Sequence, residues 1–142
     1  MKTGIALMDI KLGQALKEKR LSEHVAMSVD ASKVFIHKFN LDKETENKII
    51  NCVEAHHKDV NFNCLEAEIC ANADCYRFIH PKGFFAYLVL LGKRSDDFFD
   101  CLDQVENKLD EKINILSLDI CKEELNDYYK TLKKFIIDSR NL

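Results

Sequence analysis

The sequence predicts an all-α fold, and three observations support this prediction. The 142-residue chain contains only four glycines and one proline, which is few for a loop-rich β protein. Apolar residues recur at spacings of three and four along much of the chain, which is the period of a buried helical face. Capping residues precede several of these segments. A bundle of about six to seven helices with short connections is therefore expected.

Two helices are expected before residue 41. Residues 4–18 carry a short apolar stripe formed by Ile5, Met8, Leu12 and Leu16. The next helix should extend from Glu23 to about Phe39, because Ser22 has the chemistry of an N-cap. Asn40 should end this helix, since asparagine often follows the last helical turn.

Two more helices are expected before the proline. Asp42 should cap a helix over residues 43–57, whose acidic first turns suit the positive end of the helix dipole. Asn63 and Glu66 have the spacing of a capping box and should open a helix that ends near Ile79.

Three helices should form the remainder of the chain. Pro81 suits the first turn of a helix that ends near Gly92, and a helix from Ser95 to about Lys112 should follow. A last helix should start at Ser117 or Asp119. Its apolar stripe consists of Leu125, Tyr128, Leu132, Phe135 and Ile136. We expect one domain over residues 1–142, with the chemically distinctive motifs in 1–80 and the C-terminal helices in 81–142.

Residues with metal-binding chemistry interrupt two of these apolar stripes. The stripe in Glu46–His57 reads Ile49, Val53, His56 and His57. The stripe in Cys64–Ile79 reads Ala67, Cys70, Ala71, Asp74 and Phe78. The helical period places these polar groups on faces that should be buried. A buried carboxylate needs a cation or strong hydrogen-bond donors, and nearby imidazoles suit a divalent metal ion as that cation.

The composition argues against several classes of function. The net charge is −3, from 21 Lys and Arg against 24 Asp and Glu, and no basic stripe is present, so nucleic acid is not expected as a generic partner. The longest apolar run, residues 84–91, is too short to cross a membrane. No signal-peptide core precedes Asp9, so a cytoplasmic location is expected. The six cysteines include no Cys-x2-Cys pair and are expected to be reduced, buried residues.

Four segments resemble the HD-domain phosphohydrolase superfamily. Ala6–Lys11 resembles the family's Ala-Leu-Leu-His-Asp-Ile-Gly stretch, and Glu23–Ser28 resembles a later histidine element of binuclear members. Val53–His57 is similar to an Ile-x-x-His-His element. Leu65–Asp74 is similar to the Leu-Glu-Ala-Lys-Ile-x-x-x-Ala-Asp signature, which ends in the last metal-ligand aspartate. The similarity covers roughly residues 4–80.

This resemblance implies an HD-like bundle with a divalent metal site. The implied ligands are Asp9, His24, Asp74 and either His56 or His57, and the two aspartates are the implied catalytic residues. Adjacent helical positions lie about 100° apart, so only one of the two histidines is expected to be a ligand. Imidazole and carboxylate ligands suit Mn, Fe, Co, Ni or Zn, and Mg is also compatible. The implied function is a metal-dependent phosphohydrolase that acts on a nucleotide or another small phosphate ester.

Two cations are expected to contact that small phosphorylated molecule. Lys11 follows Asp9 closely, and Arg77 lies three residues after Asp74, which places it beside the site on the same helix. The alternative for Arg77 is a simple ion pair with Asp74. In that alternative, the pair accounts for the buried carboxylate without a metal.

Departures from the family pattern support a second hypothesis. Met8 replaces the histidine of the His-Asp pair, and only eight residues precede Asp9, so the family's first helix and its histidine are expected to be missing. The chain is then a degenerate HD domain without a metal, which acts as a ligand-binding or protein-interaction module and forms a homodimer. In a third interpretation, the bundle is unrelated to this family, and Asp74 and the histidines form a local hydrogen-bond network.

Overall fold

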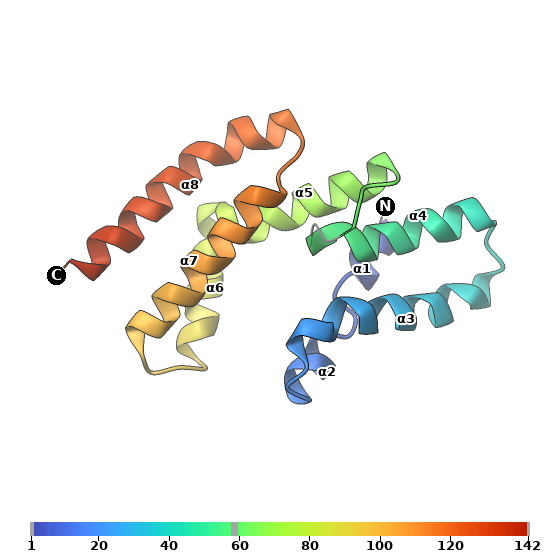
Figure 1. Ribbon diagram of the computed structural model, residues 1–142, viewed down its shortest axis with the longest axis horizontal. Coiled ribbons are helices and arrows are strands. Elements are labelled where there is room, and N and C mark those ends of the chain that lie inside the picture. The colour runs from blue at the N-terminus through green and yellow to red at the C-terminus, as the bar shows by residue number, and fades with distance from the viewer. Residues whose placement is uncertain (1, 58–59, 142) are drawn as a thin grey trace. The chain divides into compact units, whose positions relative to one another are not determined.

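The computed structural model describes residues 2–57 and 60–141. Within these residues the all-α prediction is confirmed, because every regular element is helical. The α-helices are α1 (Lys2–Leu7), α2 (Leu12–Lys17), α3 (His24–Ile36), α4 (Lys43–Glu54), α5 (Leu65–Ile79), α6 (Pro81–Gly92), α7 (Phe98–Ile115) and α8 (Asp119–Arg140) (Figure 1). Short 3-10 turns cover Leu21–Glu23, His37–Phe39 and Ala55–His57. None of the described helices is both long and apolar enough to span a bilayer.

The chain divides into two compact units, Met1–Ala71 and Asn72–Leu142, and α5 contributes to both. In the first unit, α3 and α4 form an antiparallel helical hairpin, α1 packs on α4 and α2 packs on α3 (Figure 1). The core of this hairpin consists of Leu7, Val29, Ile36, Ile49 and Val53. Gly4 allows α1 to approach α4 closely, because a Cβ at this position would lie 2.5 Å from Cys52 Cβ.

The predicted single helix over residues 4–18 is instead two short helices, α1 and α2, separated by a turn. The chain turns after Leu7, and the amide of Leu12 donates to the carbonyl oxygen of Asp9 at 3.0 Å. The amide of Lys11 donates to Ser28 Oγ on α3 at 3.2 Å. This long-range bond holds the turn against α3, and a local apolar pattern does not reveal it.

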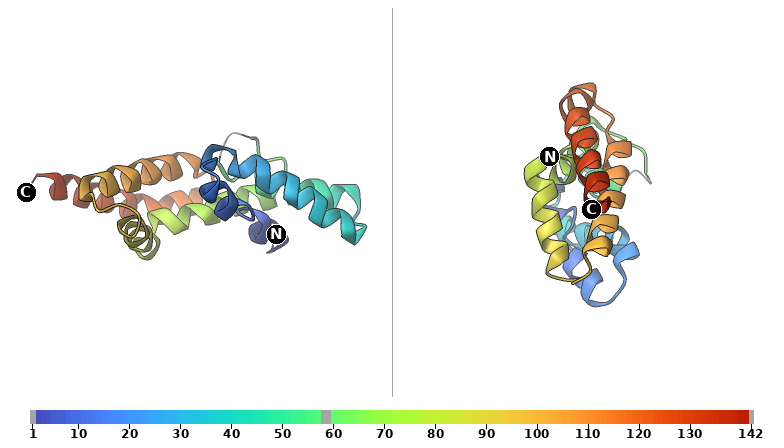
Figure 2. Two further views of the ribbon diagram at one scale, coloured as in Figure 1. Left: turned by 90° about the horizontal axis from the view of Figure 1, so that it is seen from below. Right: turned by 90° about the vertical axis from the view of Figure 1, so that its left-hand side faces the viewer.

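In the second unit, α7 packs against both α6 and α8 (Figure 1, Figure 2). The apolar stripes of α7 and α8 supply its buried residues, which include Leu102, Val105, Leu109, Leu125, Leu132 and Ile136. Pro81 occupies the first turn of α6 as expected, and the ring of His80 accepts a hydrogen bond from the amide of Lys82 as its N-cap. This arrangement places α5 and α7 in the unit that contains Asp74.

Candidate metal centre

Asp9 lies in the turn between α1 and α2. Met8, which precedes it, is buried among Cys52, Ala55, Ala67 and Cys70. The side chain of Asp9 keeps 28% of its surface exposed. The carboxylate is therefore partly accessible to solvent.

His24 is the first residue of α3, and its ring is oriented by the preceding turn. The ring nitrogen Nδ1 lies 2.7 Å from the carbonyl oxygen of Leu21. A carbonyl oxygen can only accept a hydrogen bond, so Nδ1 carries the proton and neutral His24 presents the lone pair of Nε2. With 9% of its surface exposed, the residue lies at the edge of the core.

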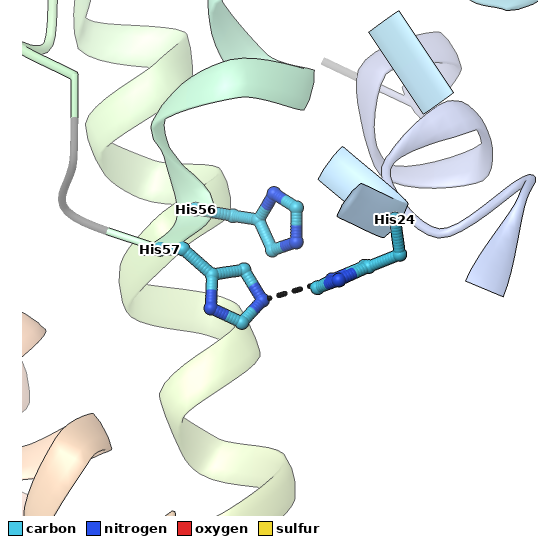
Figure 3. A group of neighbouring side chains, drawn as sticks. All are labelled: His24, His56 and His57. Carbon is cyan, nitrogen blue, oxygen red and sulfur yellow. Dashed lines mark hydrogen bonds between the residues drawn. The ribbon is translucent and has the colours of Figure 1, made fainter. Parts of the chain in front are cut away.

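His56 and His57 lie in the 3-10 turn that ends α4. Nδ1 of His56 lies 2.7 Å from the carbonyl oxygen of Val53, which fixes the same tautomer as in His24. The rings of His56 and His57 pack edge to face with centroids 4.4 Å apart, and both extend toward His24 (Figure 3). The sequence predicted one of them as the ligand and left open which one. The helix ends at Glu54, and in the turn after it both rings reach the same place.

These four side chains converge, and we call them the histidine–aspartate cluster. Nε2 of His24 lies 3.2 Å from Nε2 of His57, while Asp9 Oδ1 lies 3.6 Å from Nε2 of His56 and 3.8 Å from Nε2 of His24. Ligand atoms of the three histidines all lie within 4.8 Å of one another. A tetrahedral ion with metal–nitrogen bonds of about 2.0–2.1 Å places neighbouring ligand atoms roughly 3.4 Å apart. The spacing and the donor chemistry therefore fit a divalent metal ion.

Asp74 lies in the second unit and has cationic partners there. Its side chain is buried, with Oδ2 2.8 Å from Lys112 Nζ and Oδ1 3.0 Å from Arg77 Nη1. The ion pair with Arg77 that we considered as an alternative is confirmed, and Asp74 has the cation that its burial requires. The ligand and catalytic roles of Asp74 stay predictions.

Lys112 was missed by the sequence reasoning, although a signal was present. It is fully buried and continues the α7 stripe that runs through Leu102, Val105 and Leu109 at helical spacing. A lysine on an apolar stripe needs a buried counter-charge, as Asp74 does. The apolar stripe of α5, which contains Asp74, and that of α7, which contains Lys112, could together have predicted this ion pair.

The two predicted phosphate contacts have different surroundings. Lys11 lies in the first unit, two residues after Asp9, and its Nζ donates to Gln14 Oε1 at 2.9 Å. The Arg77 side chain is 58% exposed and pairs with Asp74 in the second unit. A role in substrate binding stays a prediction for both residues.

The thiols near the cluster are weak metal ligands. Burial raises the pKa of Cys52 to about 12 and also raises the pKa of Cys70. Both thiols are therefore protonated at neutral pH, whereas the thiolate is the form that binds metals. All six cysteines are free, as expected.

A large groove of the first unit does not coincide with the cluster. It has a volume of about 1130 Å³ and follows α3 and α4 from Lys33 and Lys43 to Asn51 and Glu54. The described residues that line it include none of the four cluster residues. We assign the chemistry to the cluster, because converging ligand atoms are a more specific signal than volume.

The comparisons with known proteins show a distant similarity to a curated ribonuclease. Among curated proteins, the chain is similar to Ribonuclease Y of Finegoldia magna (strain ATCC 29328 / DSM 20472 / WAL 2508), with 30% identity over 96 residues. The aligned region is 68% of this chain and 15% of the relative, so the chain spans a small part of that protein's length. No protein-family model and no solved structure matches the chain. The resemblance to HD-domain phosphohydrolases thus has partial support, from this similarity and from the three clustered histidines.

Proposed function

We propose that this chain is a metal-dependent phosphohydrolase that acts on a nucleotide or another small phosphate ester. The observation that carries this proposal is the convergence of Asp9 Oδ1 with the Nε2 atoms of His24, His56 and His57. The similarity to a protein named as a ribonuclease supports hydrolysis of a phosphate ester. A cytoplasmic location remains part of the proposal.

The residues of the cluster have separate roles in this proposal. When bound, a divalent ion supplies Lewis-acid chemistry, lowering the pKa of water and offsetting phosphate charge. His24 and His56 hold fixed ring orientations because backbone carbonyls bind their Nδ1 protons. Asp9 adds a negative charge to the ligand set. This set should therefore bind a divalent cation more tightly than three neutral histidines alone. Lys11, two residues later, is suited to attract the phosphate group.

Metal content measured by inductively coupled plasma mass spectrometry tests this proposal. Wild-type protein should retain nearly one equivalent of Mn, Fe, Co, Ni or Zn, and His56→Ala and His57→Ala should lose it. His37→Ala is a matched control, because His37 is an exposed histidine at the other end of α3. Wild-type protein that stays metal-free after reconstitution would overturn the proposal.

The same experiment tests the ligand role predicted for Asp74. Loss of the metal in Asp74→Asn, with helicity unchanged, would confirm that role. Retention of the metal would assign Asp74 to its ion pairs with Lys112 and Arg77. Reconstituted protein that retains metal should then be screened for hydrolysis of nucleotides and simple phosphate monoesters and diesters.

A second candidate function is a degenerate HD scaffold that binds a ligand or a protein and forms a homodimer. Two observations favour it: the residue in place of the family's histidine is the buried Met8, and Lys112 and Arg77 already compensate Asp74. Such a protein should be dimeric by light scattering, and its melting temperature should not change with EDTA. A monomer that EDTA destabilises by several degrees would exclude this alternative.

A further inference from the structure

A second groove of the first unit lies between α2 and α3. It has a volume of about 620 Å³, and Ile10, Lys11 and Gln14 form one wall. The other wall is one face of α3 with the turn after it, where Met27, Phe35 and Lys38 lie. We call it the α2–α3 groove.

Both walls of the α2–α3 groove lie close in sequence to residues of the histidine–aspartate cluster, although none of the described residues that line the groove belongs to the cluster. The first wall begins at Ile10, directly after Asp9. Successive residues of an α-helix are 100° apart around the helix axis. Around the axis of α3, His24 is therefore within about 50° of the centre of the face that forms the second wall. The groove therefore leads away from the cluster along α3. An extended substrate with its reacting phosphate at the cluster would continue into it.

The side chains of the groove suit a single-stranded oligonucleotide. Phe35 is 42% exposed, and its ring packs against Phe39, which is 58% exposed, with centroids 5.2 Å apart. Exposed aromatic rings are platforms on which nucleobases stack. Lys11 and Lys38 lie on opposite walls of the groove, where they can contact phosphates, although Asp30 also lines it and opposes an anion.

Local charge and length agree with this ligand. The charged residues that line the groove are two lysines, Lys11 and Lys38, and one aspartate, Asp30, whereas the whole chain has a net charge of −3. The distance along the helix from His24 to Lys38 is about 21 Å at 1.5 Å per residue. A stacked strand that rises about 3.4 Å per nucleotide would place roughly six nucleotides along it.

We propose that the α2–α3 groove binds the strand of a single-stranded oligonucleotide whose reacting phosphate lies at the histidine–aspartate cluster. This inference rests on the proposed function and names an oligonucleotide as its substrate class. Ribose and deoxyribose strands share the chemistry that the groove recognises, and the test below distinguishes them.

Fluorescence anisotropy with a labelled single strand tests this inference. The strand has roughly eight nucleotides, so that at 3.4 Å per nucleotide it is longer than the groove. The full chain is titrated without metal, with RNA and DNA octamers of the same sequence and with a mononucleotide as competitor. Phe35→Ala should weaken octamer binding by about tenfold, the loss expected for one stacked base. Lys38→Ala should weaken it and reduce the slope of log K against log salt by about 0.7.

Two variants in the second unit provide matched controls. Phe135→Ala removes an exposed aromatic ring and Lys134→Ala removes an exposed charge, both on α8, and neither should change octamer binding. Equal weakening by groove and control variants would overturn the inference. So would a mononucleotide that binds as tightly as the octamers. A preference for the RNA or the DNA octamer would identify the sugar that the site accepts.

The cluster variant His57→Ala separates this inference from the proposed function. Without metal, His57→Ala should still bind the octamer in the groove. The same variant should no longer retain metal. Metal retention and phosphate-ester hydrolysis without octamer binding would leave the proposed function standing and overturn the groove assignment. Octamer binding that depends on Phe35 and Lys38, in a protein that never retains metal, would support the groove and overturn the proposed function.

Discussion

The two compact units each contain a buried polar cluster, and the two clusters balance charge in different ways. In the first unit, Asp9 and three histidines bring electron-pair donor atoms close together, and a hydrogen bond joins the Nε2 atoms of His24 and His57. In the second unit, the carboxylate of Asp74 lies 2.8 Å from the ammonium group of Lys112. Polar residues on an apolar stripe therefore predict that a charge must be compensated, but not whether a metal ion or a side chain compensates it.

This difference assigns a different role to each cluster. Converging donors gain stability from an added cation, so the first unit should respond to metal. A carboxylate paired with a buried lysine already has its cation, so the second unit should depend on the lysine instead. A substitution in one unit can therefore be measured against the other unit as the reference.

The largest effect is expected from Lys112→Met. This substitution leaves the charge of Asp74 buried, with an ion pair to Arg77, whose side chain is largely exposed. Removal of one member of a buried ion pair costs about 3–5 kcal/mol of the free energy of unfolding. Urea denaturation followed by circular dichroism measures this loss.

The double variant Asp74→Leu, Lys112→Met is the control for this prediction. Replacing both members of a buried pair with apolar residues is often neutral or stabilising. The double variant should therefore recover most of the stability that Lys112→Met loses. A double variant less stable than the single one would show that the pair is not the origin of the effect.

Metal binding should produce the next largest effect, and only in the first unit. A ligand at 100 times its dissociation constant stabilises the folded state by about 2.7 kcal/mol. Hydrogen exchange with mass spectrometry should show slower exchange in α3 and α4 after addition of Mn²⁺, and unchanged exchange in α7 and α8. In His57→Ala the slowing should disappear. Equal slowing in both units would contradict the contrast between the clusters.

Two buried asparagines, one in each unit, form a matched pair. Substitution of either one by alanine should lower the free energy of unfolding by about 1–3 kcal/mol, the cost of leaving buried backbone groups without a hydrogen bond. Asn51 bonds the carbonyl of Asn61 at 3.0 Å and the amide of Asn63 at 2.8 Å in the first unit. Asn72 accepts from the amides of Ser117 and Leu118 in the second.

Each alanine substitution should destabilise its own unit. Asn51→Ala should speed hydrogen exchange in α4 and leave α8 unchanged, and Asn72→Ala should do the reverse. If either variant changes both units equally, the two units unfold as one and the comparison between them does not extend to stability.

The sequence predicted two helix boundaries from local chemistry. Asp42 accepts from the amide of Thr45 as the N-cap of α4, and Asn40 adopts a left-handed conformation with φ of 47° after the preceding helix. The prediction was wrong at the start of α3, which begins at His24 with Glu23 and not Ser22 at the N-cap position. The start of α5 agrees with the prediction to within about one residue, because the helix begins at Leu65. The amide of Asn63 donates to Asn51, twelve residues earlier, and no local pattern shows such a bond.

The four residues of the histidine–aspartate cluster were predictable from the sequence, whereas the surroundings of Asp74 were not. The pattern and the family resemblance identified Asp9, His24, His56 and His57, and the structure brings all four together. The partner of Asp74 was not predicted, because Lys112 lies 38 positions further along the chain. Long-range pairing of this kind depends on how α5 and α7 pack, which the periodicity of either helix alone does not specify.

The smallest effect is expected at the start of α4, the helix that leads to His56 and His57. Asp42 accepts hydrogen bonds from the hydroxyl and the amide of Thr45, and these bonds hold the pKa of Asp42 below its ordinary value of 3.8. Because the pKa is lowered in the folded state, Asp42 stabilises the fold above its ordinary pKa. This contribution is lost as the pH falls through the lowered value.

Asp42→Asn isolates that titration, because asparagine caps a helix about as well as aspartate but has no carboxyl group to protonate. Helicity measured by circular dichroism between about pH 5 and pH 2 should fall less steeply in Asp42→Asn than in the wild type. Asp119→Asn is the matched control, since Asp119 is an exposed aspartate at the start of α8 in the other unit. Identical acid profiles for wild type and Asp42→Asn would show that the cap does not contribute to the acid stability of α4.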